Sequence, residues 1–230
     1  MLTCVAFAAC GRVGFDPIEP DDAAPLPMGR FVTVTTAMDP TTQVLDMTIP
    51  EVAAGDLLIV ALSIHDGTAV TDIMDSNGTA LTSAGARAVK SGTASELWYA
   101  AGSEPTTGVK ITMAAMSSFD VWVAEFSGIA DAPPEAIAHG CLSYPPVVEE
   151  APAMTSLPNQ LVFSVTMLAY PVFISTISPP FAPLPPLSGN GAAYYFAPDP
   201  GSYAPSWQIG SGSGMTAMTC ASTATFSLAQ

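Results

Sequence analysis

The sequence predicts an all-β protein, an antiparallel β-sandwich with little or no helix. Two observations support this fold class: short apolar and β-branched segments recur along the chain, and Gly, Pro, Asn and Asp separate them. No segment shows the periodicity of an amphipathic helix. All-β sandwiches often fill a chain of 230 residues as one domain, so we expect a single domain over residues 30–230.

The expected strands follow one another at short intervals after Arg30. The most apolar segment, DLLIVALSI at residues 56–64, is too short for a typical helix and suits a buried central strand. Asn77-Gly78 at the centre of a turn is a strong hairpin signal. The expected strands are residues 31–35, 44–49, 56–64, 95–101, 108–113, 119–126, 160–168, 192–196 and 215–228.

The two halves of the chain resemble each other weakly. Residues 56–64 and 160–168 are both long apolar strands that follow a polar turn. The aromatic segments at 98–100 and 195–197 each precede an acidic or proline-containing turn. An internal duplication explains this similarity, and so do the two sheets of a single sandwich.

The N-terminus carries a processing motif. Phe7, Ala8 and Ala9 precede Cys10 at the end of an apolar segment, which resembles a bacterial lipobox, where the cysteine receives lipid. We therefore predict that residues 1–9 are a truncated signal peptide. Secretory signals usually run roughly 15–30 residues with a basic start, which this segment lacks. Either the true start lies upstream, or the segment is an ordinary apolar strand.

The segment after the motif has the composition of a tether. Residues 11–29 contain four prolines and four acidic residues without an apolar period. Such a composition is typical of an extended, disordered linker. We expect residues 10–29 to consist of the lipidated cysteine and a tether that holds the domain off a membrane.

The charge of the chain excludes one class of partner. Twenty acidic residues face five basic ones, for a net charge of −15, and no Lys or Arg follows Lys110. Nucleic acids are bound chiefly by neutralising their phosphates with Lys and Arg, so we exclude them. The acidity is typical of a soluble exported domain.

The four cysteines can be assigned if the lipobox is real. Cys4 leaves with the signal and Cys10 carries lipid, which leaves Cys141 and Cys220. Disulfides persist in exported proteins, so we predict a bridge between these two, with separate buried thiols as the alternative. The chain has no CxxC or HxxxH spacing and only two histidines, so we predict no metal site.

Several short motifs together resemble a module of secreted bacterial proteins. These are GDLL with following apolar residues at 55–60, VTDIMDSNG at 70–78, WYA at 98–100, EFSGI at 125–129 and PGSY at 200–203. The resemblance covers roughly residues 31–228 and implies a jelly-roll-like or Ig-like sandwich, with no assigned catalytic residues. The chain departs from the pattern at Ala80, where the module has an aromatic residue.

Acidic side chains offer two candidate sites with simpler explanations. Asp72, Asp75 and Asn77 present oxygens that suit calcium, but the binding loop is incomplete and metal-free Asx turns have the same composition. Asp120 and Glu125 lie at odd separation on one expected strand, so their side chains point to opposite faces. We expect them to face solvent rather than to act as a catalytic pair.

Aromatic residues crowd the C-terminal region and suggest a carbohydrate platform. Tyr203 and Trp207 follow Gly and Pro turns and are the best exposed candidates for glycan binding. Core packing of large aromatic side chains is the competing explanation.

The expected function is that of a lipid-anchored protein of the cell envelope, in the outer membrane of a Gram-negative bacterium. Its sandwich is a non-enzymatic binding or structural module that meets a glycan or protein partner and needs no cofactor. The alternatives are a carbohydrate-binding module and a hydrolase with a loop-assembled site. With His65 and His139 as its only histidines and no recognisable nucleophile motif, the chain is not expected to be an enzyme.

Overall fold

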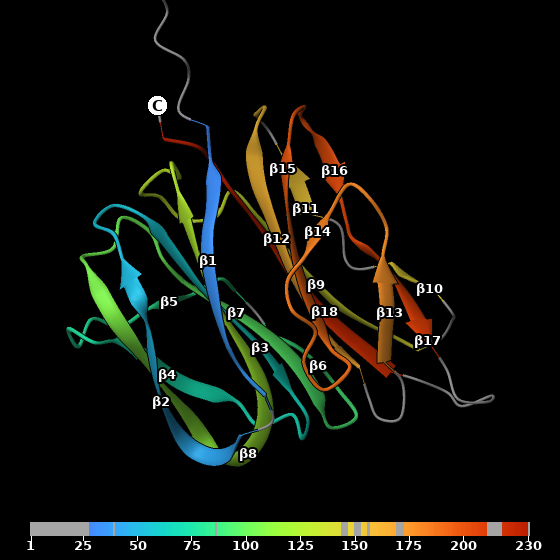
Figure 1. Ribbon diagram of the computed structural model, residues 1–230. Coiled ribbons are helices and arrows are strands. Elements are labelled where there is room, and N and C mark those ends of the chain that lie inside the picture. The colour runs from blue at the N-terminus through green and yellow to red at the C-terminus, as the bar shows by residue number, and fades with distance from the viewer. Residues whose placement is uncertain are drawn as a thin grey trace, which may run out of the picture.

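The structure, a computed structural model, confirms the predicted all-β fold. Every regular element in the described residues is a strand, and the strands form antiparallel sheets (Figure 1). No helix in these ranges is long and apolar enough to cross a membrane. The structure describes residues 28–38, 40–85, 87–143, 147–149, 153–155, 157–168, 173–210 and 218–229.

The first half of the chain forms two sheets that share one strand. Its strands are β1 (Arg30–Ala37), β2 (Thr41–Val52), β3 (Leu57–Ile64), β4 (Val70–Asp75), β5 (Thr82–Ser83), β6 (Ala88–Lys90), β7 (Thr93–Ala100) and β8 (Thr106–Ser127). An inner sheet has the order β1-β8-β3-β7-β5, with β6 also beside β7. The first part of β8 leaves this sheet and pairs with β2 and β4. The 22-residue strand β8 therefore continues from one layer into the other.

The second half repeats this arrangement. Its strands are β9 (Ala136–Ser143), β10 (Val147–Glu149), β11 (Ala153–Thr155), β12 (Gln160–Leu168), β13 (Phe173–Ile177), β14 (Ala182–Pro183), β15 (Gly191–Ala197), β16 (Gly201–Tyr203), β17 (Ser206–Gly210) and β18 (Met218–Phe226). The inner sheet has the order β9-β18-β12-β15-β14. Outside it, β17 pairs with β10 and β13, and β11 pairs with β16.

The strand orders of the two inner sheets correspond, although β6 and the β11–β16 pair have no counterpart among the described strands. β3 and β12, whose apolar sequences are alike, are both central strands of the inner sheets, and β7 and β15 hold equivalent places beside them. β10 and β13 flank β17 as β2 and β4 flank the first part of β8. The repeated order supports an internal duplication.

The two inner sheets face each other across a shared core. Trp122 and Phe126 of β8 pack with Phe163 of β12 in one buried cluster, and Tyr194 of β15 lies against its edge. Since both halves contribute to this core, a single domain over residues 30–230 remains our interpretation.

The apolar run of β3 is explained by burial on both faces. Alternate side chains such as Ile59 enter the shared core between the inner sheets. The others, such as Val60, pack with Ile73 of β4 and Ile111 of β8 in the outer core of the first half. A strand buried on both sides loses the polar alternation of a surface strand.

Candidate functional site

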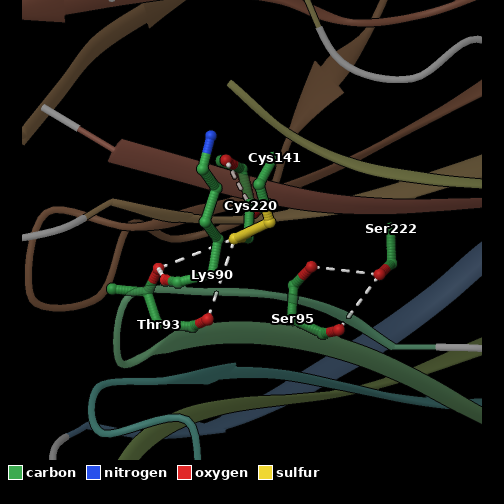
Figure 2. Close-up of a disulfide and its surroundings, with 7 residues drawn as sticks. Lys90, Thr93, Ser95, Cys141, Cys220 and Ser222 are labelled. Atoms are coloured by element: carbon green, nitrogen blue, oxygen red, sulfur yellow. Dashed lines mark hydrogen bonds between the residues drawn. A yellow bond between two sulfur atoms is a disulfide. The ribbon is translucent and has the colours of Figure 1, made fainter. Parts of the chain in front are cut away.

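The predicted disulfide is confirmed. Cys141 of the edge strand β9 lies opposite Cys220 of β18, and their sulfur atoms are 2.06 Å apart (Figure 2). Cys220 is fully buried, and its sulfur lies 3.6 Å from the hydroxyl of Thr93 on β7. The bridge thus fastens an edge strand of the second half beside a strand of the first.

The predicted lipidation site, Cys10, and the tether at 10–29 fall mainly outside the described residues, which begin at Met28. Lipidation stays a prediction.

The prediction that Trp207 is exposed and forms part of an aromatic platform is wrong. Trp207 of β17 is only 2% exposed and packs in a third core cluster on the outer side of the second inner sheet. Tyr203 is half-buried, its ring lies against Tyr195, and its hydroxyl donates to the carbonyl of Asp199. Trp207 therefore cannot offer an open ring face to a sugar, and glycan binding by Tyr203 stays a prediction.

The candidate calcium residues are used by the turn itself. Oδ1 of Asp75 accepts hydrogen bonds from the backbone N–H groups of Asn77 and Thr79, both at 2.8 Å. Gly78 has a φ of +81°, as the turn requires. Asp72 belongs to β4, and in the part of the chain that is described no group of three His, Cys, Asp or Glu could hold a metal ion.

Two acidic side chains of β8 are buried, contrary to the expectation that they face solvent. Asp120 is fully buried on the side of the shared core, and Glu125 is 3% exposed on the other side, where it accepts from the backbone N–H of Ala53 at 3.1 Å. Their placement on opposite faces agrees with the prediction. Burial and then the neighbouring carboxyl of Asp56 raise the pKa of Glu125.

Asp120 is the centre of a polar cluster that the sequence did not reveal. Its Oδ2 lies 3.3 Å from Nε2 of His65 and accepts from the amide of Asn190 at 2.8 Å, while Oδ1 accepts from Ser188 at 2.8 Å. Nδ1 of His65 lies 3.3 Å from the hydroxyl of Ser118. The order Ser118–His65–Asp120 has the members of a catalytic triad within the first half. The contacts of Asp120 with Ser188 and Asn190 join the two halves.

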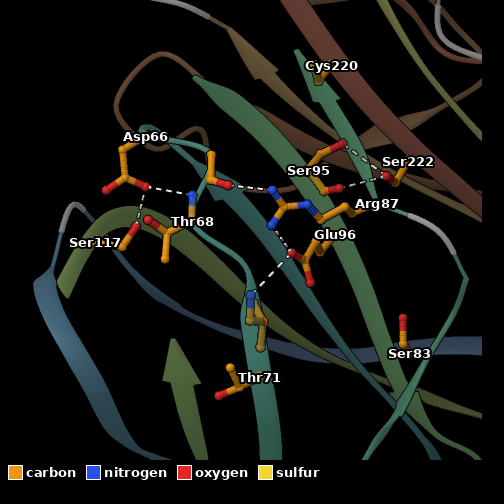
Figure 3. Close-up of polar contacts among 12 residues, drawn as sticks. Asp66, Thr68, Thr71, Ser83, Arg87, Ser95, Glu96, Ser117, Cys220 and Ser222 are labelled. Carbon is orange, nitrogen blue, oxygen red and sulfur yellow. Dashed lines mark hydrogen bonds and ion pairs between the residues drawn. The ribbon is translucent and has the colours of Figure 1, made fainter. Parts of the chain in front are cut away.

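Another buried carboxylate, Glu96 of β7, is held by a polar network in the first half (Figure 3). It receives hydrogen bonds from the indole of Trp98 at 3.0 Å and the backbone of Val70 at 3.3 Å, and Arg87 lies 3.4 Å away. Burial raises the pKa of Glu96 despite these partners. These partners tie β7 to β4 and to the segment before β6.

An acidic pocket of about 380 Å³ lies where three loops meet. Its lining includes Asp75 at the end of β4, Tyr99 near the end of β7, Glu104 of the loop from β7 to β8 and Asp131 of the segment that joins the two halves. No Lys or Arg is among its lining residues. We name this the interhalf pocket.

Hydrogen bonds hold the walls of the interhalf pocket in place. Asn77 donates to the carbonyl of Pro105 at 2.9 Å, which ties the β4 turn to the loop before β8. The backbone of Ser103 bonds with both Gly55 and Asp56, and Ala130 donates to the carbonyl of Ser227 at 2.8 Å. A pocket with walls fixed in this way loses little conformational entropy when a ligand binds.

Comparison of the chain with protein-family models, curated proteins and solved structures found no match. The resemblances to a lipobox and to a secreted sandwich module therefore stay predictions from the residues alone.

Proposed function

We propose that this chain is a lipid-anchored protein of the cell envelope, in the outer membrane of a Gram-negative bacterium, whose β-sheets form a non-enzymatic binding module. The interhalf pocket is the observation that carries the binding function. It is concave, carries three carboxylates, and lies where loops meet the ends of sheet strands, which is where binding residues usually lie.

The disulfide supports the proposed compartment. Disulfides are maintained in oxidising surroundings such as the periplasm and the cell surface, and they are rare in the cytosol. The Cys141–Cys220 bond would be stable in the compartment to which the N-terminal motif directs the chain.

Labelling with palmitate tests the anchor. The chain is expressed with a full-length signal upstream, and we expect it to incorporate label and to partition into detergent. Cys10→Ala should lose both properties because two or more acyl chains are needed for stable anchoring. Cys4→Ala is the matched control and should keep both. Equal labelling of wild type and Cys10→Ala would refute the anchor.

Hydrolysis is a second candidate function because of the Ser118–His65–Asp120 geometry. The contacts of His65 with Ser118 and Asp120 both measure 3.3 Å, which is long for a working triad. Asp120 is also bound by Ser188 and Asn190, as a structural group would be. We therefore expect no turnover of p-nitrophenyl acetate by the purified chain above buffer. Turnover that His65→Ala abolishes would make the hydrolase the better proposal.

A further inference from the structure

The interhalf pocket contains an unpaired hydroxyl. Tyr99 is 8% exposed, and its ring packs edge-on against Phe226 in the shared core at 5.6 Å. Its hydroxyl makes no hydrogen bond with the described residues. Among the side-chain nitrogen and oxygen atoms of these residues, only Nε1 of Trp207 is both fully buried and without a partner. The unpaired hydroxyl of Tyr99 is therefore not fully buried and reaches open space. Tyr99 lines the pocket, and we infer that its hydroxyl opens into it.

The state of this hydroxyl suits hydrogen bonding to a ligand. Burial raises the pKa of Tyr99, so the phenol is neutral at physiological pH. A neutral phenol both donates and accepts a hydrogen bond. A partly buried polar group without a partner gains more from a ligand than an exposed one, because water satisfies it poorly.

The charged groups of the pocket all have one sign. Glu104 and Asp131 are exposed at its wall, and Asp75 is 8% exposed within it. Asp131 lies directly over Gly102: a Cβ added to this glycine would stand 2.4 Å from the carboxyl carbon of Asp131. The absence of a side chain at Gly102, which has a φ of +59°, lets this carboxylate sit against the wall.

From these observations we propose that the interhalf pocket binds a small organic ammonium compound with primary amine groups. This inference rests on the proposed binding function. Ammonium groups donate hydrogen bonds to carboxylates and to the oxygen of a phenol, and they match the sign of the pocket. The net charge of −15 also concentrates cations near the surface.

A sugar fits the pocket less well than a cation. Sugar sites commonly offer an exposed aromatic face, but Tyr99, the aromatic residue of the lining, is 8% exposed. The pocket walls hold three carboxylates and no Lys, Arg or Asn side chain. A neutral polyol would leave these charges uncompensated, whereas an ammonium compound neutralises them.

Calorimetric titration of the purified full chain with putrescine tests the proposal. The uncharged isostere 1,4-butanediol and glucose serve as ligand controls. We expect binding of putrescine that weakens as salt is raised, and no measurable binding of the diol. Comparable binding of the diol, or binding of glucose in place of putrescine, would overturn the ammonium assignment.

Three variants locate the binding. Asp131→Asn removes one exposed charge and should weaken putrescine binding about threefold. Tyr99→Phe removes only the hydroxyl and should weaken it by a similar factor, roughly threefold. Asp46→Asn, on β2 outside the pocket, removes the same charge and should bind as wild type does. Equal weakening by Asp46→Asn and Asp131→Asn would show attraction to the whole surface and would overturn the site.

The anchoring experiment is independent of this one. Tyr99→Phe and Asp131→Asn should incorporate palmitate like the wild type. Absence of putrescine binding by the wild type, with intact labelling, would reject the ammonium ligand and keep the envelope anchor. Absence of labelling with intact binding would reject the anchor and keep the pocket.

Discussion

The disulfide gives the sharpest prediction for stability. Cys141 and Cys220 are separated by 79 residues, and a bridge that closes a loop of this length removes entropy from the unfolded chain. The chain-entropy model gives about 15 cal/mol/K, or about 4.5 kcal/mol at 25 °C. For a domain of this size each kcal/mol shifts the melting temperature by about 2–4 °C, so the bridge corresponds to roughly 10–18 °C.

The assay is thermal unfolding followed by circular dichroism. The double variant Cys141→Ala/Cys220→Ala should melt roughly 10–18 °C below the oxidised wild type if the chain-entropy term dominates. Reductant should lower the melting temperature of the wild type toward that of the variant and leave the melting temperature of the variant unchanged. A reduced wild type that melts within about 3 °C of the oxidised form would refute the reasoning, because the closed loop would then not constrain the unfolded chain.

Two further predictions concern single buried groups. Burial raises the pKa of Glu125 in the folded protein above its value in the unfolded chain. The stabilisation from the protonated carboxyl is therefore present below the unfolded pKa and is lost as the pH rises through the folded pKa. The free energy of unfolding in urea should therefore be the same for Glu125→Gln and the wild type near pH 4 and higher for Glu125→Gln at pH 7. The control Glu51→Gln, at an exposed position, should show no such difference. A wild type that becomes more stable relative to Glu125→Gln as the pH rises contradicts this account. Trp122→Phe should cost about 2–3 kcal/mol, since it removes ring volume and the hydrogen bond from Nε1 to the carbonyl of Pro185 at 2.7 Å. Trp207→Phe should lower the free energy of unfolding by about 1 kcal/mol less than Trp122→Phe, because Nε1 of Trp207 has no partner among the described residues. Equal losses of both variants in chemical denaturation would count against this account.

The apolar sequence pattern predicted the strands that are buried on both faces. It missed strands that form because they pair with a neighbouring strand. β3 and β12 were predicted because their apolar runs are dense and short. β9 was missed because AIAHGCLS is rich in small residues, and it is a strand because it pairs along its length with β18. β8 was predicted as two strands because the exposed residues 114–116 interrupt its apolar pattern, although the backbone continues between two sheets.

The polar cluster around Asp120 shows why sites are harder to predict than strands. His65 and Ser118 lie opposite each other only because β3 pairs with β8 in a register that places Ser63 across from Asp120. The register of 56–64 against 119–126 could have suggested this contact. The contributions of Ser188 and Asn190 could not be foreseen, because they come from the other half of the chain.

The repeated strand order places different cavities at equivalent connections of the two halves. The connection after β4 contains the Asx turn of Asp75 and walls the acidic interhalf pocket. The equivalent connection, after β13, contains Pro179, Pro180 and Phe181, and with Trp207 it lines an apolar cavity of about 450 Å³. The strands that hold the two loops have the same order, and the two loops differ in chemistry. Loops tolerate sequence change better than paired strands do, and divergence after a duplication would therefore give each half its own surface while the shared core is retained.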